Sequence, residues 1–457
     1  MLLDFCIENF AAIGKKQGIS LYTGKARGKS NHLLKAYRKS ILKFTSIYGS
    51  NGAGKSTMIK AMHFAKHLIT IGYLDKRLMS INRSNPIWAE KPTEFTYSIY
   101  IDKKIYEYGI SLCWKNEKII KEWLFEINSK GEYKLIFSRD FIEQKFVNNI
   151  KFKSQDLKNR ISVYFDDASK EENTVFLKEI NSKKGDLFEA EPSLQYLKSI
   201  YRWFLTKLKF VYPNNYSDLG KYSFLNHSDN NQKFYEYLLS MDIPISNMTY
   251  TNVSVEQAFK DAPFPLIQEI ENEFKEMYQQ DQSSNIESAP IAMRLNDDYY
   301  IVEAGEEGFK NIQTVKFTHG KLGAFEFSEE SDGTKRVLEL LEIITSPEQD
   351  VTYVVDEIDR SLHPLLTEKL VSMHLNHEIP NQNQLIITTH ESRLLNLRRL
   401  RKDEIYFATN HNGESEFVRL DIYENEETRS DLNIELAYLN GRYSGIPQIV
   451  KPESYYS

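Results

Sequence analysis

Apolar and polar positions along the chain predict three successive regions. Residues 1–149 begin with an apolar strand and continue with positions that alternate as in β-strands. Residues 150–295 place apolar side chains at helical spacing, and residues 296–457 return to alternating strands and helices. The pattern predicts an α/β fold in which two lobes of strands and helices flank a mainly helical insertion, with an antiparallel β region in the first lobe.

Local patterns locate individual elements within these regions. Phe95, Tyr97 and Ile99 alternate with more polar neighbours and predict a strand, and residues 129–131 (Ser-Lys-Gly) predict a hairpin turn. In the insertion, two stripes of apolar side chains at three- and four-residue spacing predict helices. The first stripe is Leu194, Leu197, Ile200, Phe204 and Leu208, and the second is Leu266, Ile267, Ile270, Phe274 and Met277.

A glycine-rich segment follows the predicted strand at residues 44–48 and precedes a predicted helix. Its residues are Gly49, Ser50, Asn51, Gly52, Ala53, Gly54, Lys55 and Ser56, followed by Thr57, and they match the phosphate-binding pattern GxxxxGK[ST]. Glycines allow successive backbone N–H groups to face the phosphates of a nucleoside triphosphate. Lys55 is expected to contact the β- and γ-phosphates, and the Ser56 hydroxyl is expected to bind Mg²⁺. A similar segment at residues 24–30 has one residue fewer between its glycines and no preceding strand, which indicates a basic loop.

Composition agrees with a soluble globular protein. The chain has 457 residues, of which 41% are hydrophobic and 27% charged. Cys6 and Cys113 have no metal-site spacing, and two cysteines suit a reducing compartment. No apolar stretch approaches the length of a membrane span, so we expect no membrane partner and a cytoplasmic location.

Charge is unevenly distributed along the chain. The net charge is −6, yet no Asp or Glu occurs between Glu8 and Asp75, an interval with twelve Lys and Arg residues. Residues 15–43 could face a polyanion such as nucleic acid. They could equally face an acidic surface of the same protein or of a neighbour, and the sequence leaves both interpretations open.

A second set of polar residues lies far along the chain from the phosphate loop. Asp356 and Glu357 end the apolar run at residues 351–355, as expected of a strand that carries a magnesium site. We expect Asp356 to hold Mg²⁺ and Glu357 to accept a proton from the attacking water. Ser331 and Gly333 start a predicted helix, where backbone N–H groups can bind an anion. His390 follows a predicted buried strand at residues 385–389, where it could donate to the γ-phosphate or position the attacking water.

The order of these motifs resembles that of ABC-type ATPase heads, including those of chromosome-structuring and break-repair ATPases. The sequence is most similar to AAA-15-type ATPases, which are related to the ATPase domains of overcoming-lysogenization-defect (OLD) nucleases. The resemblance rests on residues 7–10 (Ile-Glu-Asn-Phe), on residues 356–364 (Asp-Glu-Ile-Asp-Arg-Ser-Leu-His-Pro) and on residues 438–447, with Ser444 where a glycine is usual. It implies ATP and Mg²⁺ as cofactors and two copies that enclose ATP. In that pair Lys55 and Ser56 of one copy would face Ser331 and Gly333 of the other. A glutamine that senses the nucleotide is usual, and Gln144 and Gln155 are both candidates.

Several alternatives are weaker. The sequence fits neither an AAA+ motor, whose Asp-Glu strand would lie much nearer the phosphate loop, nor a GTPase, which would contain an Asn-Lys-x-Asp segment. Too few residues follow His390 for a nuclease domain of the OLD kind. The Arg27-x4-His32 spacing indicates chance more than a nuclease motif, and His374 and His377 indicate a helix surface more than a metal site. The leading hypothesis is an ATPase subunit similar to those of bacterial anti-phage systems such as PARIS, which control a separate nuclease or toxin. The alternative is a DNA-repair or chromosome-associated ATPase that binds DNA directly.

Overall fold

The structure is a computed structural model, and its described residues form two compact units. It describes residues 1–36, 39–73, 80–152, 155–182, 188, 192–213, 231–260, 263–283, 291–295, 298–321, 323–346, 348–376, 382–423 and 433–443. The first unit comprises Met1–Tyr216, Glu348–Asp359 and Leu375–Ser457, and the second comprises Ser217–Pro347 and Arg360–His374. The boundaries between these units differ from the region boundaries that the sequence suggested, which fall after residues 149 and 295.

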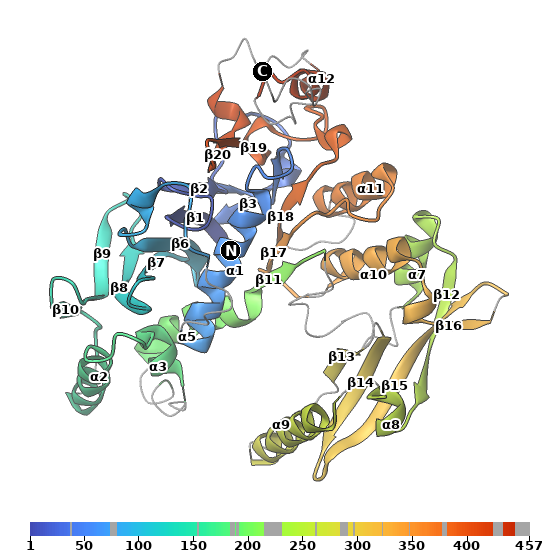
Figure 1. The fold of residues 1–457 in the computed structure, drawn as a ribbon, viewed down its shortest axis with the longest axis horizontal. Helices are drawn as coiled ribbons and strands as arrows, with labels where there is room; N and C mark the ends of the chain where they lie inside the picture. The colour runs from blue at the N-terminus through green and yellow to red at the C-terminus, as the bar shows by residue number, and fades with distance from the viewer. Residues whose placement is uncertain are drawn as a thin grey trace. The chain divides into compact units, whose positions relative to one another are not determined.

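A mostly parallel sheet forms one layer of the first unit (Figure 1). The strand order is β11-β17-β18-β5-β19-β20, in which β20 alone runs antiparallel to its neighbour. Each of β5, β17 and β18 is buried along its whole length, as is typical of parallel strands covered on both faces. The bounds are β5 (Phe44–Tyr48), β11 (Leu208–Val211), β17 (Thr352–Val355), β18 (Gln384–Thr389), β19 (Ile405–His411) and β20 (Glu414–Arg419).

The second layer of the first unit is an antiparallel sheet of order β10-β9-β8-β7-β6-β1-β2. Gly131, at φ 82°, lies in the tight connection between β8 and β9, where the hairpin turn was predicted. Strands β3 and β4 form a separate two-stranded antiparallel hairpin. The bounds are β1 (Leu2–Glu8), β2 (Gln17–Ser20), β3 (Leu33–Ala36), β4 (Lys39–Leu42), β6 (Thr93–Ile101), β7 (Lys104–Cys113), β8 (Lys118–Ile127), β9 (Tyr133–Asp140) and β10 (Lys145–Asn148).

Helix α1 (Lys55–Ile71) packs between these two sheets within one apolar core. Phe64 contacts the ring of Phe95 on β6, and the Tyr97 hydroxyl donates to the Met62 carbonyl at 2.6 Å. The same core includes Val354 of β17 and Ile386 of β18. Because α1 is apolar on both sides, the helix that follows the phosphate loop is fixed against both layers.

Three further helices cover the antiparallel sheet: α2 (Gln155–Ala168), α3 (Phe176–Asn181) and α5 (Gln195–Arg202), the last continuing as the π-helical segment η5 (Trp203–Lys207). Glu122 of β8 forms a fully buried ion pair with Arg139 of β9 at 2.6 Å. The Glu122 carboxylate also accepts the backbone N–H groups of Phe176 and Leu177 at the start of α3. Sheet and helix are therefore joined by a buried polar network as well as by apolar contacts.

The second unit is built on the antiparallel sheet β12-β15-β14-β13, with β16 paired to β15. Helix α9 packs on this sheet through Phe274, which contacts Phe309 of β15. The bounds are α7 (Asn231–Ser240), β12 (Ile245–Asn252), α8 (Val255–Ala258), α9 (Phe264–Ser283), β13 (Ile291–Leu295), β14 (Asp298–Gly305), β15 (Gly308–His319), β16 (Ala324–Glu326), α10 (Asp332–Thr345) and α11 (Pro364–Leu375). Within the described residues, no helix is long and apolar enough to cross a membrane.

The described residues between 150 and 295 form helices, and they also include the strands β11, β12 and β13. Leu208, assigned to a helical stripe from its spacing, instead begins β11, which pairs with β17. The four-residue step from Phe204 to Leu208 fits a helix, and pairing with a distant strand overrides that local signal. Strand β12 was missed because most of its residues are polar and exposed, with Ile245 and Met248 buried.

Candidate nucleotide-binding site

Three parallel strands bring the predicted site residues of the first unit to one edge of the sheet. Tyr48 of β5 is paired with Thr389 of β18, and Ile387 of β18 is paired with Val355 of β17. Gly49, His390 and Asp356 follow the last residues of these strands. Because parallel strands end at the same edge, β18 places His390 between the phosphate loop and the carboxylates.

The phosphate loop needs glycine at specific positions. Gly52 and Gly54 have φ of 78° and 101°, a region that side chains disfavour. A Cβ on Gly54 would lie 2.1 Å from the Ser415 Oγ, and one on Gly49 would lie 2.4 Å from the Ala408 carbonyl oxygen. Strands β19 and β20 therefore press against the loop, and helix α1 begins directly after it at Lys55. Ser50, Asn51 and Ala53 complete the loop, and Thr57 lies in the first turn of α1, where free N–H groups favour an anion.

Lys55 is buried and turned back onto the loop. Its Nζ donates to the carbonyl oxygens of Gly49 at 2.8 Å and Ser50 at 3.1 Å. Burial lowers the pKa of Lys55 to about 8, against the opposing influence of Asp356, Glu357 and Asp359. The phosphates of a bound nucleoside triphosphate would place negative charge beside this ammonium group.

Ser56 and Asp356 form the contact expected of a magnesium site. The Ser56 hydroxyl donates to Asp356 Oδ1 at 3.1 Å, and the Asp356 side chain is buried at the end of β17. Oxygen ligands of this kind suit Mg²⁺, which is commonly held by one or two protein groups together with phosphate oxygens and water. Among the described residues no cluster of three or more His, Cys, Asp or Glu could hold a metal by itself. The residues present fit a magnesium ion that arrives with its nucleotide.

Thr388 connects Asp356 with Glu357. Its hydroxyl donates to Asp356 Oδ1 at 2.5 Å and accepts the backbone N–H of Glu357 at 2.8 Å. Glu357 has φ of 48°, which a non-glycine residue adopts at a cost of about 1–3 kcal/mol. The surrounding hydrogen bonds hold this conformation, so the direction of the Glu357 backbone depends on a threonine of the neighbouring strand.

The next threonine holds the turn that carries His390. The Thr389 hydroxyl donates to Asp359 Oδ1 at 2.6 Å, and the His390 backbone N–H donates to the same carboxylate at 3.2 Å. Burial, followed by the charge of Lys55, lowers the pKa of His390 below its ordinary value of 6.5. The lowered pKa favours the neutral imidazole, in which one nitrogen can donate and one can accept.

Ser331 and Gly333 belong to the second unit, at the start of α10. The Ser331 hydroxyl accepts the N–H of Thr334 at 3.1 Å, as a helix N-cap does. A Cβ on Gly333 would lie 3.0 Å from the Ser361 carbonyl oxygen, so the absence of a side chain permits this close approach. Ser331 is exposed at the helix start.

Other residues considered from the sequence lie elsewhere. Gln144 follows β9, where its side chain donates to the Phe141 carbonyl, and Gln155 begins α2. His32 is buried against Glu404, and His374 is buried in α11. His377 and residues 444–447 of the C-terminal motif lie outside the described residues.

Sequence reasoning missed five residues that shape the site: Thr388, Thr389, Asp359, Ala408 and Ser415. Asp359 lies in the quoted motif at residues 356–364, and Thr388 and Thr389 lie in the predicted strand at residues 385–389, but nothing in a single sequence pairs a hydroxyl with a particular carboxylate. Ala408 and Ser415 carry no motif at all, and packing alone brings them to the loop.

The fold and this site together define an α/β nucleotide-binding head with a phosphate loop. The chain belongs to the family described as "AAA domain, putative AbiEii toxin, Type IV TA system", whose model matches residues 44–396 and so includes every motif from the phosphate loop to His390. The finer resemblance to AAA-15-type ATPases remains an expectation.

Solved structures similar to the chain include several heads of Smc proteins. One is an SmcHead bound to the C-winged helix domain of ScpA, with 14% identity and a TM-score of 0.41 over 92% of this chain and 99% of that chain. Another is the SMC head domain from Thermotoga maritima, with 12% identity and a TM-score of 0.34 over 92% and 98%. A third is an Smc head domain with an extended coiled coil, bound to the C-terminal domain of ScpA derived from Pyrococcus furiosus. It has 14% identity and a TM-score of 0.36 over 97% and 99%. No curated protein matches the sequence.

Proposed function

We propose that this chain hydrolyses ATP and acts as the regulatory ATPase of a bacterial anti-phage system, controlling a separate nuclease or toxin. The observation that carries the ATPase part is the chain of contacts Ser56–Asp356–Thr388–Glu357 at the edge where the phosphate loop begins. These contacts link the Ser56 hydroxyl and the buried Asp356 carboxylate with the backbone of Glu357, whose carboxylate we assign to proton transfer. A turn with a purely structural role would not require a hydroxyl and two carboxylate residues beside an anion-binding loop.

Each residue has a defined task in this proposal. Backbone N–H groups of the loop and the first turn of α1 bind the phosphates, and Lys55 neutralises charge that develops on the γ-phosphate. Ser56 and Asp356 hold Mg²⁺, which when bound neutralises the phosphate oxygens during transfer. Glu357 accepts a proton from the attacking water, and neutral His390 contacts the γ-phosphate or orients that water.

A second copy of the chain would complete the site. Ser331 is exposed at the start of α10, where the helix N-terminus favours an anion. In the proposed pair, Ser331 and Gly333 of one copy contact the γ-phosphate held by Lys55 and Ser56 of the other. ATP then becomes part of the interface, and hydrolysis releases it.

The regulatory role rests on what surrounds the ATP site. Among the described residues no cluster of three or more His, Cys, Asp or Glu could hold a metal ion, and the sequence motifs all belong to the nucleotide site, so we place the effector on a separate protein. The family description names a toxin of a Type IV toxin–antitoxin system, which supports a role in a system that includes a toxin.

Two variants separate nucleotide binding from hydrolysis. Lys55→Ala should weaken binding of a fluorescent ATP analogue because it removes the cation from the loop. Glu357→Gln should keep that affinity and reduce phosphate release by about 10²- to 10⁴-fold, the usual contribution of a general base. With ATP it should also sediment as a dimer. Phosphate release at the normal rate by Glu357→Gln would show that the base is assigned to the wrong residue.

The defence role needs a separate test in cells. The gene with its neighbours should reduce phage plaque formation, and both variants should abolish the effect. Copurification of a neighbouring gene product from the same cells would identify the effector. An active ATPase that purifies alone and gives no phage protection would overturn the regulatory role while leaving the ATPase assignment intact.

A further inference from the structure

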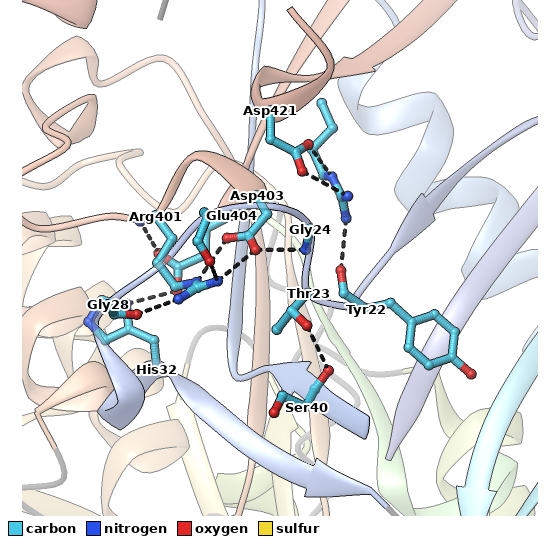
Figure 2. A network of polar contacts seen from close by, with 12 residues as sticks. Tyr22, Thr23, Gly24, Gly28, His32, Ser40, Arg401, Asp403, Glu404 and Asp421 are labelled. Atoms are coloured by element: carbon cyan, nitrogen blue, oxygen red, sulfur yellow. Dashed lines mark hydrogen bonds and ion pairs between the residues drawn. The ribbon is translucent and has the colours of Figure 1, made fainter. Parts of the chain in front are cut away.

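Two basic segments from opposite ends of the chain meet in the first unit, and we call them together the basic corner (residues 23–32 and 396–404). Arg401 donates to the carbonyl oxygens of Ala26, at 2.8 Å, and of Gly28. Asp403 accepts the Gly24 N–H at 2.8 Å, and Lys29 Nζ donates to the Leu397 carbonyl at 2.9 Å. Figure 2 shows this network around Arg401 and Asp403. The loop at residues 24–29 is therefore held in place by residues that follow it by most of the chain.

In the basic corner the negative charges are buried and the exposed charges are positive. Its cations are Lys25, Arg27, Lys29, Arg398, Arg399, Arg401 and Lys402, and its carboxylates are Asp403 and Glu404. Both carboxylates are buried: Asp403 pairs with Arg401 at 2.8 Å, and Glu404 contacts His32 at 2.8 Å. The exposed ionisable groups of the corner are thus cationic.

Three of these cations are available to a partner. Lys25, Arg27 and Arg398 are exposed, and within the described part of the chain none of them has an ion-pair partner. Lys16, in the same acid-free interval, instead faces an acidic residue of its own chain, because it pairs with Glu94 at 2.9 Å. The tertiary structure therefore separates cations that pair internally from cations that face solvent.

The basic corner lies at the opposite edge of the parallel sheet from the phosphate loop. Glu404 directly precedes β19, and its carbonyl accepts the Ser46 hydroxyl of β5 at 3.1 Å. Lys43 directly precedes β5, and its N–H donates to the His32 carbonyl at 2.9 Å. Since β5 and β19 run parallel, the corner is at their amino ends and Gly49 is at the carboxyl end. Its cations are therefore separate from those that bind ATP.

We propose that the basic corner binds the phosphate backbone of a nucleic-acid duplex. A chain of net charge −6 repels polyanions except where cations gather, and arginine and lysine on a fixed loop are suited to phosphate contacts. Tyr22 beside the corner has its ring covered by Lys39, whose Nζ is 4.6 Å from the ring centroid. Among the described residues, the geometry at Tyr22 thus offers charge and no uncovered ring, which favours a duplex backbone over single-stranded bases. This surface goes beyond the proposed function and does not require hydrolysis.

Fluorescence anisotropy with labelled 30-base-pair duplexes of random sequence, one of DNA and one of RNA, would test the surface. Binding is measured without nucleotide, so that a failure of the ATPase assignment does not affect it. The wild-type chain should bind with an affinity that falls steeply with salt. The triple variant Lys25→Glu, Arg27→Glu, Arg398→Glu should bind at least about tenfold more weakly, and its log–log salt slope should fall by about 3, one for each phosphate contact removed.

A matched variant separates the surface from net charge. Lys130→Glu, Lys145→Glu, Lys158→Glu makes the same charge change at exposed lysines of the same unit. It should retain near wild-type affinity, and both variants should keep the wild-type unfolding midpoint. Equal weakening by the two variants would overturn the proposal, as would failure of the wild-type chain to bind either duplex at low salt. Binding of acidic proteins or self-association in place of duplex binding would also overturn it.

Discussion

The hydroxyl of Thr388 lies 2.5 Å from Asp356 Oδ1, a contact between the ends of two neighbouring parallel strands. The same oxygen accepts the N–H of Glu357, so one side chain orients both the carboxylate proposed to bind magnesium and the backbone of the proposed base. Thr388 is fully buried and touches the reacting groups through these two residues, which makes it a positioning residue.

Thr388→Val should therefore lower the turnover of ATP more than its affinity. Valine keeps the shape but removes both hydrogen bonds, so we expect kcat to fall by about 10- to 100-fold, since about 1.4 kcal/mol corresponds to a factor of ten. Thr388→Ser should restore most of the rate because it restores the hydroxyl. Steady-state kinetics would measure both effects.

Thr45 of β5 provides the control for this substitution. It is equally buried, and in the described residues its hydroxyl has no hydrogen-bond partner. Thr45→Val should leave kcat almost unchanged. A similar loss of rate in both valine variants would indicate a general packing defect and contradict the positioning role of Thr388.

ATP affinity should fall above about pH 8. Burial lowers the pKa of Lys55 to about 8, so the free protein loses this positive charge as the pH rises through that value. Bound triphosphate favours the charged form, and binding must then take up a proton, which weakens affinity by up to about tenfold per pH unit. Titrations with a fluorescent ATP analogue from pH 7 to 9.5 would measure this dependence. The Lys55→Arg variant, whose guanidinium stays charged, should lack it, and a flat wild-type profile would contradict the assignment.

Asp4→Asn should stabilise the protein at neutral pH. Burial raises the pKa of Asp4 from 3.8 to about 6, despite a hydrogen bond from Ser20. The folded state then binds the proton more tightly than the unfolded state, so the contribution of Asp4 to stability is full below about pH 4 and is lost as the pH rises through about 6. At pH 7 the variant should gain about 1–3 kcal/mol, about 1.4 kcal/mol for each pKa unit.

Urea unfolding between pH 4 and 8 would measure this difference. The gain of Asp4→Asn should disappear toward pH 4, whereas Asp166→Asn, an exposed change on α2, should have little effect throughout. A constant difference between wild type and Asp4→Asn across this pH range would refute the titration of Asp4.

Glu122→Gln should strongly destabilise the first unit. Glu122 and Arg139 are both fully buried, and the substitution leaves the guanidinium charge uncompensated at a cost of about 3–5 kcal/mol. Glu126→Gln on the same strand breaks an exposed pair with Lys104 and should cost less than about 1 kcal/mol. Thermal unfolding monitored by circular dichroism would compare the two, and equal midpoints would contradict the importance of the buried pair.

Much of the fold was accessible from local patterns. The loop from Gly49 to Ser56 sits between β5 and α1 as predicted, because glycine freedom, an apolar strand and a helical stripe all act within a few residues. β11 was not accessible, since its assignment depends on pairing with β17 across more than a hundred residues. Three-residue and four-residue spacings near Leu208 favoured a helix, but pairing with a distant strand makes this segment a β-strand.

By itself, the sequence determined that the chain carries a phosphate loop, a carboxylate pair and a terminal histidine in the order of an ABC-type ATPase, because each motif is a local run of residues. Only the tertiary structure decided which side chains meet. It placed Thr388 between Asp356 and Glu357, Ser415 against Gly54, and Arg401 under the loop at residues 24–29. These contacts join residues distant in sequence, and their geometry follows from the packing of strands and loops that no local pattern encodes.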